Sequence, residues 1–160
     1  MIRAILAADK DWGIGKDGTM PWPHNTDDLK WFRDCTLDST VIMGRKTWDS
    51  LPIQPLPNRK NAVVTRQIDV DIFTKSDIIL DVDTITNHID TLYPGTHKWI
   101  IGGAQLVTTL LPVIDEIWIS RLDMVYSCDT FLPKYEIRKW YRRVSMLHDT
   151  LTLEKWVKIK

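Results

Sequence analysis

The sequence of 160 residues has little of what usually announces a function. Its two cysteines, Cys35 and Cys128, form no metal-binding motif and are too few for a disulfide scaffold, so reduced thiols and a cytoplasmic location are expected. The four histidines are scattered without the spacing of metal ligands. No serine or cysteine lies in a recognisable nucleophile motif. These absences argue against a metal centre and against nucleophilic catalysis by serine or cysteine.

Net charge and long apolar segments are missing as well. The formal net charge is zero and the isoelectric point is near 6.9, which gives no electrostatic reason to expect binding to nucleic acid or to an anionic membrane. No apolar run reaches membrane-spanning length, and Asp9 and Asp11 follow the apolar start too soon for a signal peptide. With 44% hydrophobic and 26% charged residues, the composition predicts one globular domain over residues 1–160.

Apolar, β-branched segments alternate with helical segments along most of the chain. Strands are predicted at 2–8, 40–43, 61–65, 98–101 and 115–122, and helices at 26–36, 45–50, 84–92 and 103–110. This alternation predicts an α/β sandwich on a mainly parallel sheet. The C-terminal part differs, because 140–147 and 151–159 are typical of two strands joined by a turn at 148–150.

Asp28 is a lone carboxylate on what should be the buried face of a helix that begins near Asn25 or Thr26. At about 100° per residue it lies about 40° from Phe32, whereas Asp27 points away. Loss of hydration beside apolar side chains raises the pKa of a carboxyl group and suits it to proton transfer near neutral pH, although the positive helix end opposes this shift. The segment alone leaves a second interpretation open, namely an acid that only caps the helix.

Three glycine-bearing segments accompany this helix. Residues 12–22 hold three glycines and end in a Pro-Trp step, which predicts a mobile loop. In residues 41–47 a strand ends at glycine, and two cations and a hydroxyl follow at a helix start, a combination that suits a phosphate group. The paired glycines at 102–103 also allow close approach of a ligand, without the spacing of a dinucleotide fingerprint. An ordinary turn or a solvated helix end is the alternative for each.

These segments together resemble dihydrofolate reductase. The matching motifs are Gly13-x-Gly15-x-x-Gly18, Pro21-Trp22, Asp28-Leu29-x-x-Phe32, Val41-Ile42-Met43-Gly44-Arg45-Lys46-Thr47-Trp48, Leu56-Pro57-x-Arg59-Lys60-Asn61, Ile101-Gly102-Gly103 and Asp129-Thr130-x-x-Pro133. The resemblance implies a three-layer sandwich with an eight-stranded mixed sheet, helices on both faces and an antiparallel C-terminal hairpin. It also implies NADPH-dependent reduction of 7,8-dihydrofolate to 5,6,7,8-tetrahydrofolate by a monomer, as part of one-carbon metabolism.

The resemblance assigns roles to residues of the substrate pocket. Asp28 would bind the pterin and promote its protonation through water, while Met20 and Trp22 belong to the loop that closes over the site. Arg59 would bind a carboxylate of the substrate's glutamate tail. The remaining residues matched to this pocket are Ile5, Ala7, Leu29, Phe32, Leu51, Leu56, Ile101 and Ser120. The apolar members of this set could equally belong to an ordinary core.

NADPH is the cofactor that the resemblance implies. Lys46 and Thr47 would hold its pyrophosphate from one glycine turn and residues 102–105 from the other, while Arg45 and the pair Thr65-Arg66 would lie near the adenosine 2′-phosphate. The full set matched to the cofactor is Ala7, Ile14, Gly15, Gly18, Met20, Gly44, Arg45, Lys46, Thr47, Thr65, Arg66, Ile101, Gly102, Gly103, Ala104, Gln105, Leu106 and Val107. No metal ligand is implied.

Three places depart from the family pattern. Val107 stands where the family usually has a tyrosine near the nicotinamide, Leu132 replaces a frequent phenylalanine, and the segment 52–55 is longer than in many relatives. Two other functions stay open. One is a related reductase for a pyrimidine intermediate of flavin synthesis, which would have no reason to keep Asp28, Phe32 and Arg59 together. The other is a non-catalytic folate-binding or structural protein, which only Val107 supports.

Overall fold

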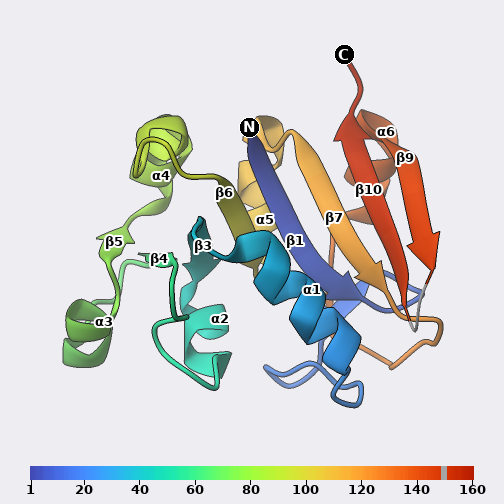
Figure 1. Cartoon of the computed structure of the whole chain (residues 1–160), viewed down its shortest axis with the longest axis horizontal. Helices are drawn as coiled ribbons and strands as arrows, with labels where there is room; N and C mark the ends of the chain where they lie inside the picture. The colour runs from blue at the N-terminus through green and yellow to red at the C-terminus, as the bar shows by residue number, and fades with distance from the viewer. Residues whose placement is uncertain (149–150) are drawn as a thin grey trace.

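The computed structural model describes residues 1–148 and 151–160 and contains an eight-stranded mixed sheet with helices on both faces (Figure 1). The strand order is β5-β4-β3-β6-β1-β7-β10-β9. All pairs from β5 to β7 are parallel, and β10 and β9 add an antiparallel edge. The strands are β1 Ile2–Ala8, β3 Thr40–Gly44, β4 Lys60–Val64, β5 Ile78–Leu80, β6 Lys98–Gly102, β7 Glu116–Arg121, β9 Tyr141–His148 and β10 Thr152–Lys158. The predicted fold class is confirmed.

Short polar side chains define where several helices begin. Asn25, Asp69 and Asp81 each accept the backbone N–H three residues further on, which satisfies a donor that has no partner within the helix. The helices are α1 Thr26–Thr36, α2 Arg45–Ser50, α3 Val70–Lys75, α4 Val82–His88, α5 Ala104–Leu110 and α6 Lys134–Trp140, with 3-10 turns η1 Ile89–Thr91 and η2 Leu111–Val113. Asn25, rather than Thr26 or Asp28, therefore caps α1.

The structure corrects several predicted boundaries. Trp140, predicted to begin a strand, is the last residue of α6, and β9 begins at the next residue. The helix predicted to begin at 84 begins at Val82, because the cap lies at Asp81. The segments that form α3, β5 and α6 are too short to show a clear apolar period and were not predicted. Residues 149 and 150 of the predicted turn lie outside the described residues.

Alternation along the strands divides the buried side chains between the two faces of the sheet. In β1, Ala4 and Leu6 belong to the larger core cluster, whereas Ile5 belongs to a smaller cluster on the other face. The smaller cluster also holds Phe32 of α1 and Trp48 of α2, so it lies beneath these two helices. No helix in the described ranges is both long and apolar enough to cross a lipid bilayer.

Tyr141, which is only 1% exposed, tests how far buried hydrogen bonds stabilise this fold. Its hydroxyl lies 2.9 Å from the carbonyl oxygen of Leu111 and 2.6 Å from that of Ile114. Tyr141→Phe removes the donor from both oxygens and should lower the free energy of unfolding by about 1–2 kcal/mol in urea denaturation. Tyr135→Phe, at a position 75% exposed, is the matched control and should change stability little. Equal effects of the two substitutions would contradict this role of Tyr141.

Candidate active site

Asp28 and Ser120 form the polar centre of the site. Asp28 lies in the first turn of α1 and donates its backbone N–H to the Asn25 side chain at 3.1 Å. Its half-buried carboxyl lies near Ser120 on β7, which is 1% exposed. Burial raises the pKa of Asp28 above its usual value, and the Ser120 hydroxyl offsets part of this rise by stabilising the ionised form. A carboxyl group so placed can hold or deliver a proton closer to neutral pH.

The apolar residues predicted to bind substrate surround this centre. Ile5, Phe32, Leu51, Leu56 and Ile101 all belong to the smaller core cluster, most of them only partly buried. Ala7 is paired with Ser120 across β1 and β7, and Leu29 on α1 is 41% exposed. Ala7, Ile101 and Ser120 lie at the carboxyl ends of the parallel strands β1, β6 and β7, where open α/β sheets bind ligands.

A cavity of about 280 Å³ adjoins this apolar surface at Leu56, and Arg59 is among the residues that line it. The Arg59 guanidinium donates to the Pro57 carbonyl oxygen at 2.8 Å and to the Thr36 hydroxyl at 3.0 Å, so neutral acceptors fix its position. Burial, followed by the charge of nearby Arg33, lowers the pKa of Arg59. Arg33 also lines the cavity and was missed, because the motif that identified the helix ends at Phe32. The two cations favour an anionic group here.

The two glycine turns predicted to hold a pyrophosphate lie against each other. A Cβ atom added to Gly44 would be 4.0 Å from both the Gly102 oxygen and the Gly103 nitrogen, and one added to Gly102 would be 3.0 Å from the Thr47 hydroxyl. Gly102 has φ +138 and is joined to Gly103 by a cis peptide bond. Gly44 and Gly103 are the N-caps of α2 and α5, and neither has a side chain to accept the first N–H groups. Such uncapped backbone N–H groups can donate hydrogen bonds to a bound anion.

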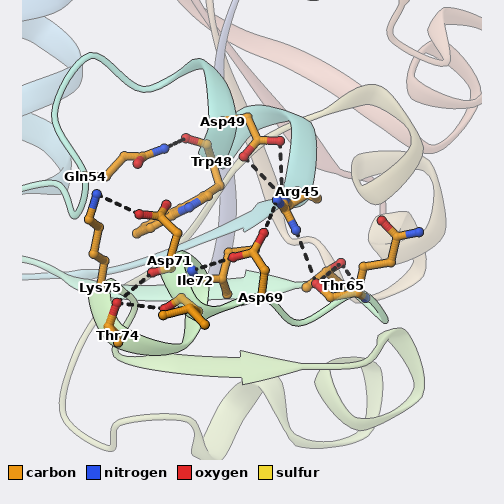
Figure 2. A network of polar contacts seen from close by, with 12 residues as sticks. Arg45, Trp48, Asp49, Gln54, Thr65, Asp69, Asp71, Ile72, Thr74 and Lys75 are labelled. Carbon is orange, nitrogen blue, oxygen red and sulfur yellow. Dashed lines mark hydrogen bonds and ion pairs between the residues drawn. The ribbon is translucent and has the colours of Figure 1, made fainter.

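Arg45, predicted to lie near a phosphate, is engaged by acids in the structure (Figure 2). Its Nε lies 3.1 Å from both carboxylate oxygens of Asp49, and its Nη2 donates to Asp69. Its Nη1 lies 3.3 Å from the carbonyl oxygen of Gln67, whose backbone N–H donates to the Thr65 hydroxyl. Arg45 and Thr65 are thus linked through Gln67. The part played by Asp69 was not predicted, because no element was assigned to its segment.

The glycine loop is held by the segment before α6. Its strand β2, Gly13–Gly15, pairs with β8, Thr130–Phe131. The Asp17 backbone N–H donates to the Asp129 carboxylate at 3.0 Å, and the Asp129 backbone N–H donates to the Gly15 carbonyl oxygen at 3.0 Å. Met20 is 54% exposed, whereas Trp22 is 8% exposed and packs with Leu122 and Leu151. Trp22 therefore anchors the end of the loop, and Met20 is free to contact a ligand.

Asp9 also connects the glycine loop to the segment before α6. This role was not predicted from the sequence. Asp9 is fully buried, and its carboxylate accepts backbone N–H groups of Asp11, Gly13 and Tyr126 at 2.8–3.0 Å and the thiol of Cys128 at 3.5 Å. Burial alone would raise the pKa of Asp9, but these donors outweigh it and the pKa lies below its usual value. A single acid directly after an apolar strand was the available signal, yet its partners lie up to 119 residues away.

The end of the predicted cofactor set is less accessible. Val107 is completely buried and Leu106 is 7% exposed, and both belong to the larger core cluster. Gln105 and Lys46 are exposed at the helix starts. Valine in place of the usual tyrosine thus fills a core position, and its proposed contact with nicotinamide stays a prediction. Among the described residues no group of three or more His, Cys, Asp or Glu side chains could hold a metal ion.

Comparisons with known proteins agree on one family. A family model described as dihydrofolate reductase matches residues 1–152. Dihydrofolate reductase from Bacillus subtilis (strain 168) is 36% identical over 140 residues, which cover 88% of this chain and 80% of that protein. Bifunctional dihydrofolate reductase-thymidylate synthase from Glycine max is 33% identical over 159 residues, covering 87% of this chain. The chain spans only 30% of the length of this bifunctional relative.

A solved structure extends the likeness to the whole fold. Dihydrofolate reductase from Enterococcus faecalis, complexed with NADP(H) and RAB-propyl, superposes with a TM-score of 0.84 and 26% sequence identity. The superposition covers 100% of this chain and 97% of that chain. The eight-stranded sheet and both glycine turns therefore lie within the matched region.

The buried carboxylate of Asp9 should stabilise the loop through its ionised form. Asp9→Asn replaces an acceptor by a donor and should lower the free energy of unfolding by about 1–3 kcal/mol at about pH 7. Because its pKa is depressed, Asp9 contributes fully above its ordinary value of 3.8, and the contribution is lost as the pH falls through the lower folded-state pKa. Urea denaturation should therefore show the same loss at about pH 5.5.

Asp11→Asn is the matched control, because its side chain is 55% exposed and lies 3.7 Å from Lys134. It should change the free energy of unfolding by less than about 0.5 kcal/mol. A loss for Asp9→Asn that shrinks between the two pH values would show that its carboxylate is not held ionised by these donors.

Proposed function

The chain belongs to the dihydrofolate reductase family, and from this we propose that it catalyses the NADPH-dependent reduction of 7,8-dihydrofolate to 5,6,7,8-tetrahydrofolate. The observation that carries the proposal is the half-buried Asp28 carboxyl beside Ser120, near the carboxyl ends of the parallel strands, where the two glycine turns also lie. The deciding experiment is oxidation of NADPH that depends on added dihydrofolate. Absence of this oxidation by the purified protein would refute the proposal.

The residues present fit an NADPH molecule, which would supply the hydride. The N-caps Gly44 and Gly103 leave the first amides of α2 and α5 without a side-chain acceptor, and the Thr47 hydroxyl faces Gly102 and Gly103. Side chains on these glycines would narrow the gap between the turns, so their absence leaves room for a pyrophosphate. The complex of the Enterococcus faecalis relative with NADP(H) supports this choice of cofactor.

Asp28 has the properties needed to protonate a substrate nitrogen. Its raised pKa keeps a proton available closer to neutral pH than an exposed aspartate would. The Ser120 hydroxyl near the carboxyl favours its ionised form, and the surrounding apolar cluster, which includes Ile5 and Phe32, matches a flat aromatic ring. We propose that Asp28 binds the polar edge of the pterin and promotes protonation of N5 through a water molecule.

The loop and the cationic cavity would complete the substrate complex. Met20 is exposed on a segment fixed at both ends, by Asp9 at one and by Trp22 at the other, so the middle can close over a ligand and exclude water. Arg59 retains guanidinium N–H groups beyond the two that are engaged, and these can bind a carboxylate of the glutamate tail. Arg33 adds a second positive charge to the same cavity.

Both cysteines are free in the structure, which fits the reducing environment of the cytoplasm, where we propose that the protein acts. We further propose that the protein is a monomer, which sedimentation equilibrium can test. The alternative of a non-catalytic protein rested on Val107, and burial of Val107 in the core gives that position a packing role instead.

Asp28→Asn should reduce kcat by about 100-fold or more at about pH 7, because it is nearly isosteric and removes only the proton-active group. The loss should shrink in acid, where solvent protonates N5 without help. In the wild type, the rate should fall as the pH rises through the raised pKa of Asp28. Asp27→Asn, at the exposed neighbouring position, is the control and should change kcat little. Equal loss in both variants would assign the proton transfer to another group.

Arg59→Ala should raise KM for dihydrofolate about 10-fold or more with kcat nearly unchanged, because the proposed ion pair exists equally in the ground and transition states. A pterin substrate without the glutamate tail should bind the wild type and the variant equally well. A melting curve controls for the lost hydrogen bond to Thr36. Strong preference for the tailed substrate in the variant would place the tail elsewhere.

A further inference from the structure

We propose that Asp69 determines cofactor preference by competing with the 2′-phosphate of NADPH for Arg45. This inference rests on the proposed function, since it needs a cofactor at the glycine turns. The ion pair between Arg45 and Asp69 joins two elements that lie 24 residues apart in the chain, α2 and the start of α3 (Figure 2). The Asp69 carboxylate thus places a negative charge beside the guanidinium of Arg45, which would otherwise be available to the cofactor alone.

The place of Arg45 in the site follows from the neighbouring turns. Gly44, directly before Arg45, faces Gly102 and Gly103, where the pyrophosphate is proposed to bind. On its other side Arg45 reaches the carbonyl oxygen of Gln67, in the turn that follows β4. The adenosine half of a cofactor that leaves the pyrophosphate toward β4 therefore passes Arg45 before it reaches Thr65. A 2′-phosphate on that half would be attracted to the guanidinium.

The guanidinium of Arg45 is already neutralised in this structure. Its Nε is shared by the two oxygens of Asp49, its Nη2 is taken by Asp69, and its Nη1 faces the Gln67 carbonyl oxygen. Two carboxylates around one cation leave a local charge of −1. A phosphate monoester would add a charge of about −1.5 to −2, so it would be repelled unless a carboxylate gives way.

Asp69, rather than Asp49, is the carboxylate that can be changed without disturbing the helix that carries Arg45. Asp49 lies one turn along α2 from Arg45, at the favourable i,i+4 spacing. Asp69 comes from another element, and its other oxygen accepts the backbone N–H of Ile72 at 2.9 Å as the N-cap of α3. The cap holds the carboxylate in place beside Arg45. Asparagine is an equally good N-cap, so Asp69→Asn removes the charge and keeps the helix start.

The consequence differs between the two nicotinamide dinucleotides. NADPH must displace Asp69 or accept its repulsion, whereas NADH has a neutral 2′-hydroxyl at this position and meets no such opposition. Asp69 should therefore weaken NADPH binding selectively and narrow the preference of the enzyme for NADPH over NADH. Thr65, whose hydroxyl accepts from the Gln67 backbone at 3.0 Å, and the exposed Arg66 would then contribute more of the remaining selectivity.

The test is the dissociation constant of NADPH and of NADH, measured by tryptophan fluorescence for the wild type, Asp69→Asn and Asp71→Asn. Asp71 is the matched control, because it lies on the same helix with the same charge but pairs with Lys75 at 2.7 Å. Asp69→Asn should tighten NADPH roughly 2- to 5-fold at low ionic strength, with NADH unchanged. The gain should shrink in high salt, and Asp71→Asn should leave both constants unchanged.

Two further proteins, Arg45→Gln and the double variant with Asp69→Asn, show whether Asp69 acts through Arg45. In an Arg45→Gln background the NADPH gain from Asp69→Asn should largely disappear, because no guanidinium is left to release. An unchanged ratio of the two dissociation constants in Asp69→Asn, a weaker binding of NADPH, or a gain that persists in the Arg45→Gln background would each overturn the inference. Failure of the proposed function looks different: the wild type would then bind neither dinucleotide and would not reduce dihydrofolate.

Discussion

The parallel pairing of β1 with β6 on one side and β7 on the other is the constraint on which the rest of the molecule depends. It brings the carboxyl ends of three strands to the same end of the sheet, so residues far apart in the chain, such as Ala7 and Ser120, become neighbours. Because side chains alternate along each strand, the same pairing sends Leu6 into the larger core and Ile5 toward the site. Neither the acid on α1 nor the glycine turns would have a common position without it.

At this end of the sheet, buried side chains hold the two ends of the glycine loop in place. Asp9 is fully buried, and its charge is tolerated because three backbone N–H groups and a thiol point at it. It ties the start of the glycine loop to the segment around Tyr126, while Trp22 holds the loop's end in an apolar cluster. Between these anchors residues 16–20 are exposed, and Met20 among them is 54% exposed.

The sequence was informative where local pattern decides the outcome. The helical period placed Asp28 on the same side as Phe32, and the glycine turns followed predicted strands, so both halves of the site could be predicted from residues and family motifs. It was uninformative where long-range contacts decide. In the sequence Asp9 looks like an ordinary acidic loop residue, because the backbone N–H of Tyr126 that donates to it lies 117 residues away. Trp140 has the aromatic character of a strand residue, yet α6 continues through it.

The two arginines at opposite ends of the site show why the presence of a cation does not by itself predict what it binds. Arg59 is held by a carbonyl oxygen and a hydroxyl, both neutral, and the cation Arg33 lies nearby, so the local charge favours an approaching anion. Arg45 has carboxylates on two sides, so its charge is already balanced before any ligand arrives. An anion approaching Arg59 gains an ion pair, whereas one approaching Arg45 exchanges one ion pair for another. The charge balance at Arg45 therefore depends in part on Asp69, which comes from a segment that no local motif connects to α2.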